Sequence, residues 1–236
     1  MAFLSGKDTK ILVDDVDLSG YFNNLDETAE LAGLVTTTFG KAAVTRVTGL
    51  KDGRVTLGGF FDSGVDAVDE EIRAAFTTFR VFTAAKEGLV IGKPTTLLSA
   101  LSTNYRRSAP VADVVSVSVD IEPDGGLDFG VSLHDLTAET ATGNSASVDN
   151  AAATTTGAVA HLHVTAASGT TPSLTTKVQH SVDNAVWVDL ITFTAATART
   201  KERKTVTGTV NRYLRETRTI SGTTPSFTFA VACARQ

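Results

Sequence analysis

The sequence predicts a mainly β protein with one flanking α-helix, in which a β-sandwich or barrel lobe is followed by a second, smaller β-sandwich lobe. Three observations favour this fold class. Most of the chain alternates apolar and polar residues, as half-buried strands do. Apolar residues recur at helical spacing at 66–79. After Asp124-Gly125-Gly126 the composition shifts to Thr, Ala and Ser, so we expect a domain at 1–130, a linker and loop at 131–157, and a carboxyl sandwich at 158–236.

The first lobe contains an alternating segment, KILVDDVDLS at 10–19, and a predicted hairpin, AVTRVTGLKDGRVTLGGFF at 43–61. Two β-branched runs flank Lys51, Asp52, Gly53 and Arg54 in the second segment. Asp-Gly is a strong signal for a tight turn because both residues tolerate positive φ. We therefore expect the turn of this hairpin at Asp52-Gly53.

The predicted helix spans about 66–79, with Asp66 as its cap and acidic residues in its first turn. Its apolar stripe consists of Val68, Ile72, Ala75, Phe76 and Phe79.

The second half begins with a stretch of small residues without a period, ETATGNSASVDNAAATTTG, which indicates a loop or linker. About six short strands follow between 158 and 234, a pattern typical of a sandwich. The hexapeptide SGTTPS occurs twice there, at 168–173 and 221–226. Gly supplies positive φ and Pro interrupts a ladder, so we expect each copy to be the turn of a hairpin.

Charge is distributed unevenly along the 236 residues, whose net charge is −5. Residues 1–128 carry 12 Lys/Arg and 19 Asp/Glu, whereas residues 129–236 carry nine and seven. An acidic first half argues against tight binding of nucleic acid there. The chain has no apolar run long enough to span a membrane and no signal-peptide pattern, so we expect a protein made in a cytoplasm and not inserted in a membrane.

No constellation with catalytic or metal-binding spacing is found in the sequence. His161 and His163 share one face of a strand, but zinc spacings are absent, and we interpret both as polar strand residues. There is no G-x-S-x-G elbow and no phosphate loop. Cys233 reads as a small buried thiol, and Trp187 as a core anchor or, alternatively, a platform on which a sugar stacks. We predict no enzymatic activity, no cofactor and no metal.

Several stretches resemble the tail tube (major tail) proteins of long-tailed bacteriophages, particularly those of actinobacterial phages and prophages. They are KDTKILVDDVDLSGYFNNL, TTTFG and GLKDGRVTLGGFFD in the first half, and HLHVTAASGTTPSLTTKVQHS, Trp187 and TVNRYLRETRTISGTTPSFTFAVA in the second. The resemblance covers nearly the whole chain and consists of turn and packing motifs.

The resemblance implies a structural virion protein of the tail, assembled in the host cytoplasm, whose rings stack into a tube through which DNA is ejected. Its partners would be other copies of itself, the tape measure, tail terminator and tail tip proteins, and DNA in transit without sequence-specific binding. With two lobes per chain, a ring of six chains or of three remains open. The alternative is a head-decoration or tail-tip module whose carboxyl sandwich, with Trp187, His161 and His163, contacts a host-surface glycan.

Two sets of residues are candidates for the tube function. Acidic side chains should line the channel because repeated attraction for phosphate would stall DNA. The candidates are Asp14, Asp15, Asp17, Asp62, Asp66, Asp120 and Glu122, although these acids are also what a solvated exterior would carry. The predicted turn at Lys51, Asp52, Gly53 and Arg54 is the candidate contact with a neighbouring subunit.

Overall fold

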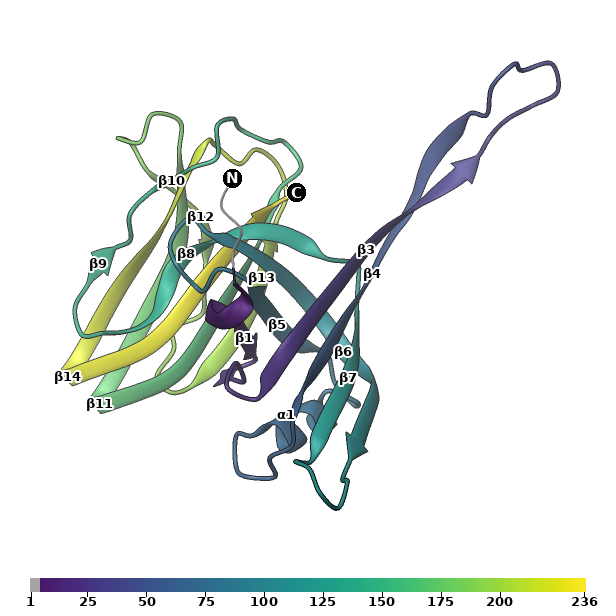
Figure 1. Ribbon diagram of the computed structural model, residues 1–236. Coiled ribbons are helices and arrows are strands. Elements are labelled where there is room, and N and C mark those ends of the chain that lie inside the picture. The colour runs from purple at the N-terminus through teal and green to yellow at the C-terminus, as the bar shows by residue number, and fades with distance from the viewer. Residues whose placement is uncertain (1–4) are drawn as a thin grey trace. The chain divides into compact units, whose positions relative to one another are not determined.

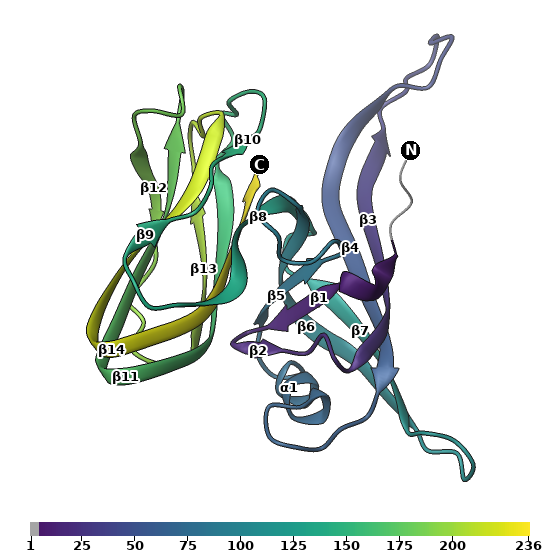
Figure 2. The same cartoon turned by 60° about the vertical axis from the view of Figure 1, so that its left-hand side comes forward.

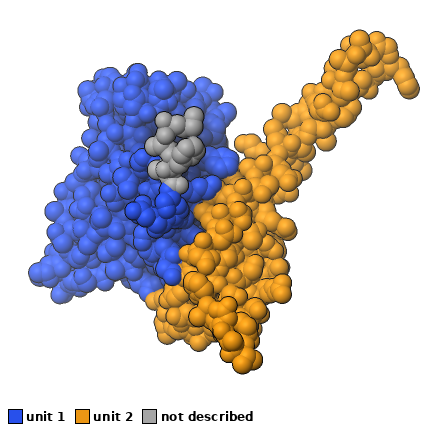
Figure 3. Space-filling model, viewed as in Figure 1, with its two compact units in different colours: residues 1–20, 80–97, 128–236 blue, residues 21–79, 98–127 orange. Residues whose placement is uncertain are grey.

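The computed structural model describes residues 5–236, and these are mainly β with one short α-helix, as the sequence predicts. The chain forms two compact units that interleave along the sequence (Figure 3). Unit 1 contains residues 1–20, 80–97 and 128–236, and unit 2 contains residues 21–79 and 98–127. This division differs from the expected succession of 1–130, 131–157 and 158–236, because the strand that begins at 128 pairs on one side with the strand that begins at 94 and on the other with the last strand.

Unit 1 is built on two long antiparallel strands, β11 (Ala158–Ser181) and β14 (Tyr213–Arg235), which pair along most of their length. Shorter strands extend the sheet on both sides (Figure 1). On β11 these are β12 (Val188–Thr192) and β13 (Thr200–Val206), and on β14 they are β8 (Asp128–Glu139), β9 (Gly143–Asn144) and β10 (Val148–Asp149).

Both long strands bend near their middle, so that the sheet folds back on itself as a sandwich (Figure 2). Leu162 and Phe229 before and after the bend share one buried core with Leu174 and Leu214 from the other halves of the same strands. Burial of such apolar side chains is the main stabilising contribution to the fold. Cys233 belongs to this core, as predicted, and burial raises the pKa of its thiol to about 12.

The two SGTTPS copies lie at this bend and pair with each other, Ser168 opposite Ser226 and Ser173 opposite Ser221. The prediction of two hairpin turns is therefore wrong. Gly169 and Gly222 do adopt positive φ, of 112° and 124°. The same turn chemistry here bends two neighbouring strands together, because each copy finds its partner 53 residues away.

The remaining strands of unit 1 come from the first half of the chain. After a 3-10 turn, η1 (Gly6–Asp8), the strands β1 (Lys10–Val13) and β2 (Val16–Asp17) form a hairpin closed by Asp14-Asp15, where Asp14 has φ of 54°. β1 also pairs with β5 (Arg80–Ala85). The alternating segment at 10–19 is thus interrupted by a tight turn.

Unit 2 contains a sheet in the order β3–β4–β7–β6. β3 (Phe22–Val35) pairs with β4 (Arg46–Phe60), β4 with β7 (Ser116–Pro123), and β7 with the later part of β6 (Pro94–Ser108). One face is apolar and buried, through Val55, Leu57, Val117, Val119 and Ile121.

The helix, α1 (Val68–Ala74), is shorter than the predicted 66–79. Val68, Ile72 and Ala75 are buried as expected, but Phe76 and Phe79 are exposed, and the cap is Ala67 instead of Asp66. The hydroxyls of Thr77 and Thr78 donate to the carbonyl of Ala74. Such local side-chain bonds compete with the helical ladder, so the helix ends early.

The predicted linker at 131–157 is largely ordered by strand pairing. Residues 131–139 belong to β8, and Val131 of this strand is the register partner of Cys233 on β14. Farther along, β9 and β10 pair with β14. The alternation in VSLHDL is a strand signal that the prediction passed over because the polar, small-residue stretch directly follows it.

Candidate functional site

The most exposed part of unit 2 is a two-stranded arm formed by β3 and β4 (Figures 1 and 3). The two strands pair from Phe22 opposite Gly59 to Val35 opposite Arg46, whereas β7 pairs only with residues 55–60 of β4. Residues 28–54, which we call the arm, therefore have no third strand among the described residues. The segment at 36–45 that joins the two strands is exposed throughout and includes TTTFG.

The arm carries large apolar side chains that the rest of the described chain leaves exposed. Phe39 is fully exposed, at 109%, and Leu50 is 85% exposed. The complete set is Leu31, Leu34, Val35, Phe39, Val44, Val47 and Leu50. A two-stranded ribbon is at best marginally stable by itself in water, and contiguous exposed apolar residues mark interaction sites. The arm is therefore the candidate interaction site of the molecule.

The residues predicted to form the turn of the hairpin lie instead within β4. Lys51, Asp52, Gly53 and Arg54 pair in register with residues 28–31 of β3, and the chain reverses at 36–45. The prediction of a turn at Asp52-Gly53 is wrong because a long, continuous ladder with β3 includes these residues. They do belong to the arm, at its base.

Gly53 is needed for close packing and not for a turn. A Cβ atom at this position would lie 2.9 Å from Cγ of Leu127 and 3.1 Å from the carbonyl oxygen of Thr28. A glycine inside a strand often marks such a close approach.

Two of the predicted channel acids, Asp120 and Glu122, lie on the polar face of the sheet of unit 2. Asp120 accepts hydrogen bonds from Thr56 at 2.8 Å and Asn104 at 3.1 Å, and Glu122 forms an ion pair with Arg54 at 3.0 Å. The bonds from Asn104 and Thr56 lower the pKa of Asp120, so this face keeps its negative charge near neutral pH. Unit 2 as a whole carries seven Lys/Arg and 13 Asp/Glu, a balance of −6.

The other five acids lie elsewhere. Asp14 is fully buried in unit 1 and pairs with Arg80 and Lys201, so its carboxylate is not presented to solvent. Asp15 and Asp17 are partly exposed and form ion pairs with Arg199 and Lys10. Asp62 and Asp66 flank the turn before α1, where Asp62 accepts a bond from the amide of Gly64 and the amide of Asp66 donates to Glu70.

The residues proposed for glycan contact separate in the structure. His161 and His163 do share a face of β11, as predicted, but both are buried in unit 1. Trp187 is partly exposed, in the loop before β12, with Cζ of Arg215 4.2 Å from its ring centroid. It lies outside the buried core, so the prediction of a core anchor is wrong.

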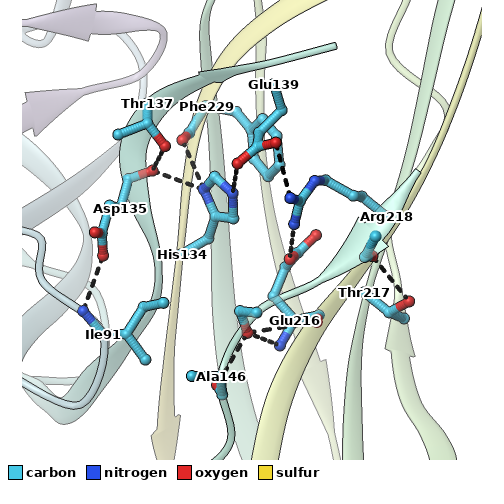
Figure 4. Close-up of polar contacts among 12 residues, drawn as sticks. Ile91, His134, Asp135, Thr137, Glu139, Ala146, Glu216, Thr217, Arg218 and Phe229 are labelled. Carbon is cyan, nitrogen blue, oxygen red and sulfur yellow. Dashed lines mark hydrogen bonds and ion pairs between the residues drawn. The ribbon is translucent and has the colours of Figure 1, made fainter. Parts of the chain in front are cut away.

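A polar cluster inside unit 1 was not singled out from the sequence (Figure 4). Arg218 bridges Glu139 at 2.8 Å and Glu216 at 3.0 Å, and His134 stacks on Phe229 within 3.4 Å of Glu139. Burial is the main cause that raises the pKa of Glu216 to about 7 and lowers the pKa of His134. The sequence signal was the charged run RETR inside an otherwise alternating strand.

Within residues 5–236, no group of three or more His, Cys, Asp or Glu side chains is placed to hold a metal ion. In the same part of the chain, no helix has the length and apolar character that crossing a membrane requires.

No protein-family model matches the chain, and no curated protein matches it. Solved structures do. The SPP1 tail tube matches with 17% identity and a TM-score of 0.45, over 53% of this chain and 78% of that one. The tail of an empty gene transfer agent particle, of C6 symmetry, matches with 16% identity and a TM-score of 0.42, over 54% and 98%. SPP1 Dit, a hub protein of the adsorption apparatus, matches with 13% identity and a TM-score of 0.33, over 96% and 98%. The chain is thus similar in structure to phage tail tube and tail hub proteins.

Proposed function

We propose that this chain is a structural virion protein that polymerises into stacked rings and forms a phage tail tube, the conduit for DNA ejection. The sequence resemblance is one support. The observation that carries the proposal is the arm, an exposed two-stranded ribbon with seven uncovered apolar side chains. The actinobacterial type of the resemblance stays a prediction.

The arm favours association with further copies of the chain for an energetic reason. Burying a large apolar side chain gives roughly 1.5–3 kcal/mol, so covering several of the seven offsets much of the entropy lost on association. β3 also pairs with β4 alone among the described residues, so one edge is open to another strand. Contacts between an arm on one copy and a different surface on the next are head-to-tail contacts, which form a ring when the rotation between successive copies closes.

In the proposed tube the polar face of unit 2, with Asp120 and Glu122, lines the channel. The support is that its acids are held by hydrogen bonds on a rigid sheet and that unit 2 has a balance of −6. Fixed negative charge repels phosphate and lets DNA pass. Asp14 does not line the proposed channel because it is buried. The proposed ring contains either six chains or three.

The partners in this proposal are other copies of the chain, the tape measure, tail terminator and tail tip proteins, and DNA that passes without sequence-specific binding. The protein acts in the virion tail after assembly in the host cytoplasm, and its role is structural and not catalytic.

Self-assembly is the decisive experiment. The purified chain should form rings or tubes in negative-stain micrographs and large species in sedimentation velocity. The double variant Phe39→Asp and Leu50→Asp, which places charge on the apolar arm, should remain folded and sediment as a monomer. The matched control is Val111→Asp, which changes an equally exposed valine outside the arm. A wild-type chain that stays monomeric at every concentration and with added tail-tip complex would contradict the proposal.

The channel is tested separately in assembled particles. Replacing Asp120 and Glu122 with Lys should slow DNA ejection, because each ring then adds attractive phosphate contacts. Asp113→Lys, in the exposed loop between β6 and β7, is the control. Unchanged ejection with the first variant would mean that these acids only solvate the exterior.

One observation favours the alternative of a binding module for a host-surface glycan. The loop before β12 contains the partly exposed Trp187 together with the exposed Val182 and Val186, and Val188 at the start of β12 is also exposed. An aromatic ring with apolar neighbours is a surface on which a sugar stacks. His161 and His163 are buried and take no part. Glycan-array binding that Trp187→Ala abolishes, by a chain that does not polymerise, would favour this function over the tube.

A further inference from the structure

His161, Thr83 and His163 form a hydrogen-bonded chain inside unit 1. Oγ1 of Thr83 lies 3.0 Å from Nδ1 of His161 and 2.8 Å from Nε2 of His163. Nδ1 of His163 bonds the carbonyl oxygen of Asp14, in the turn between β1 and β2. All four residues are buried. The chain therefore connects β11 through β5 to the β1–β2 turn.

The acceptor atoms determine where the protons lie in the hydrogen-bond network of His161, Thr83 and His163. A carbonyl oxygen only accepts, so Nδ1 of His163 carries the proton and Nε2, in a neutral ring, accepts from the hydroxyl of Thr83. The oxygen of that hydroxyl then accepts from Nδ1–H of His161. Nε2 of His161 remains as an unprotonated buried nitrogen without a partner.

Only two neutral rings satisfy this arrangement. A second proton on His163 would force the hydroxyl of Thr83 to turn away from this ring, and a proton on Nε2 of His161 would lie at an atom without a hydrogen-bond partner. A buried donor left without an acceptor costs free energy. The hydrogen bonds among the three side chains are thus complete while both rings are neutral, and one added proton disrupts them.

The neighbouring charges act differently on the two rings. His163 and Arg203 further lower the pKa of His161, whereas Asp14 and Asp15 raise the pKa of His163 and are outweighed by its burial. β5 contributes Arg80, and β13 contributes Lys201 and Arg203. The acids that face this region already have cationic partners: Asp14 with Arg80 and Lys201, Asp15 with Arg199, and Asp128 with Arg203. β14 places only Ala230 and Ala232 opposite the two histidines. An added positive charge would find no free carboxylate.

We propose that the His161–Thr83–His163 chain is an acid-sensitive latch that holds the β1–β2 turn on β5 and β11 while both histidines are neutral and releases it when they take up a proton. Other contacts also hold the turn. The amide of Asp14 donates to the carbonyl of Val81 at 2.8 Å, and the amide of Val81 donates to the carboxylate of Asp14 at 2.9 Å. The pairs made by Asp14 and Asp15 complete its attachment.

The direction of the pH effect follows from linkage. Burial lowers the pKa of His163 to about 4 and that of His161 well below its usual value. Both groups are neutral in the closed latch and bind protons more readily once exposed, at a pKa of about 6.5. The stabilisation they contribute is therefore present above pH 6.5 and is lost as the pH falls toward 4.

Hydrogen exchange on the full chain tests the latch. With the pKa of His163 at about 4 when closed and about 6.5 when open, protonation of His163 alone should make opening roughly 20-fold more frequent at pH 5 than at pH 7, and a proton taken up by His161 would add to this factor. The amides of Asp14, Leu18 and Val81 should show this acceleration after correction for intrinsic exchange. The amides of Leu174 and Phe193, which lie in the other half of the sandwich, should not. Equal acceleration of both sets of amides would indicate global unfolding and would overturn the proposal. The absence of any acceleration would overturn it as well.

Two variants test whether the accelerated exchange arises from the His161–Thr83–His163 network. His163→Gln removes a titrating ring and should abolish most of the acceleration, whereas His180→Gln, a matched change outside the latch, should retain it. If His163→Gln does not fold, a titration of the histidine ring resonances of the wild-type protein by NMR tests the latch instead. His161 and His163 should not titrate above pH 5 in the folded protein, and a pKa of 6 to 7 for either ring would overturn the latch.

Discussion

At the scale of single residues, the bend of the sandwich depends on two glycines in equivalent positions. A Cβ atom on Gly169 would lie 2.7 Å from the carbonyl oxygen of Thr224, and one on Gly222 would lie 2.9 Å from the carbonyl oxygen of Thr171. Each glycine thus faces the other copy of its own hexapeptide. The repeat in the sequence becomes a local twofold symmetry in space.

Replacement of either glycine by alanine should destabilise unit 1 strongly and to a similar extent. Gly169→Ala and Gly222→Ala each add a backbone clash to the strain of positive φ, so we expect a loss of about 3 kcal/mol or more. Gly208→Ala is the control, since Gly208 also has positive φ but open space around it, and should cost only about 1 kcal/mol. Denaturant unfolding followed by the single Trp187 measures the three values, and equal losses at all three sites would refute the role of the clash.

Glu216 should make the stability of unit 1 depend on pH in the direction opposite to the histidine latch. Its pKa in the folded protein, about 7, lies above the value of about 4.3 in an unfolded chain. The stabilisation from its bound proton is fully present below pH 4 and is lost as the pH rises through 7, by about 4 kcal/mol.

The variant Glu216→Gln isolates this contribution because glutamine has nearly the same shape and does not titrate. The difference in the free energy of unfolding between Glu216→Gln and wild type should shift in favour of the variant from pH 5 to pH 8. A constant difference across this range would show that Glu216 does not take up a proton on folding.

At the scale of elements, the segment at 140–157 is held in place although the sequence indicates a loop or linker there. The loosely held segment lies instead at the end of the arm. Residues 140–157 are fastened to β14, where Ser145 bonds the backbone of Glu216 on both sides and Asp149 pairs with Arg212 at 2.6 Å. The exposed, unattached segment is 36–45. Proteolytic cleavage concentrates in such exposed segments, so we expect cleavage at 36–45 in the arm and not at 140–157.

Gly53 should be the sensitive position of β4. Gly53→Ala brings a methyl group against Leu127 and the backbone of Thr28, and we expect a loss of about 1–2 kcal/mol. Gly33→Ala on the paired strand meets only the flexible side chain of Arg46, at 3.4 Å, and should change stability by less than about 0.5 kcal/mol. Hydrogen exchange at amides of β4 and β7 measures both. Similar effects would mean that Leu127 yields to the added methyl group.

At the scale of the whole molecule, the exposed apolar residues are concentrated in unit 2. Of the 18 large ones among residues 5–236, 13 lie in this unit, which is the smaller of the two. Unit 1 encloses a complete core, whereas unit 2 leaves apolar surface and a strand edge uncovered. Such a surface needs partners, and the proposed assembly provides them.

Trypsin should therefore distinguish free chains from assembled ones. Lys41 and Arg46, at the end of the arm, should be cleaved rapidly in the monomer and at least tenfold more slowly in tubes, because assembly buries the arm. Lys7, exposed in unit 1, serves as a reference site. Equally fast cleavage at Lys41 in tubes and in monomers would show that the arm is not buried in the subunit contact, although the chain could still form a tube through other surfaces.

The sequence by itself determined the mainly β class, the one helix near 68–74, the shared face of His161 and His163 and the burial of Cys233. These features follow from local periodicity and from the chemistry of single side chains. It also indicated the acidic character of the first half, which the structure concentrates in unit 2. Asp120 and Glu122 could be proposed from charge alone, but not their position on one polar face.

Only the tertiary structure decided which strands pair and where the chain reverses. Asp52-Gly53 and SGTTPS both carry turn chemistry, and both lie inside long strands, because ladders with partners 20 or more residues away outweigh a local preference for reversal. Glycine permits a turn, a bend or a close approach equally well, and the residue opposite selects among them. The arm was missed for the same reason: whether an apolar side chain is covered depends on strands that are distant in sequence.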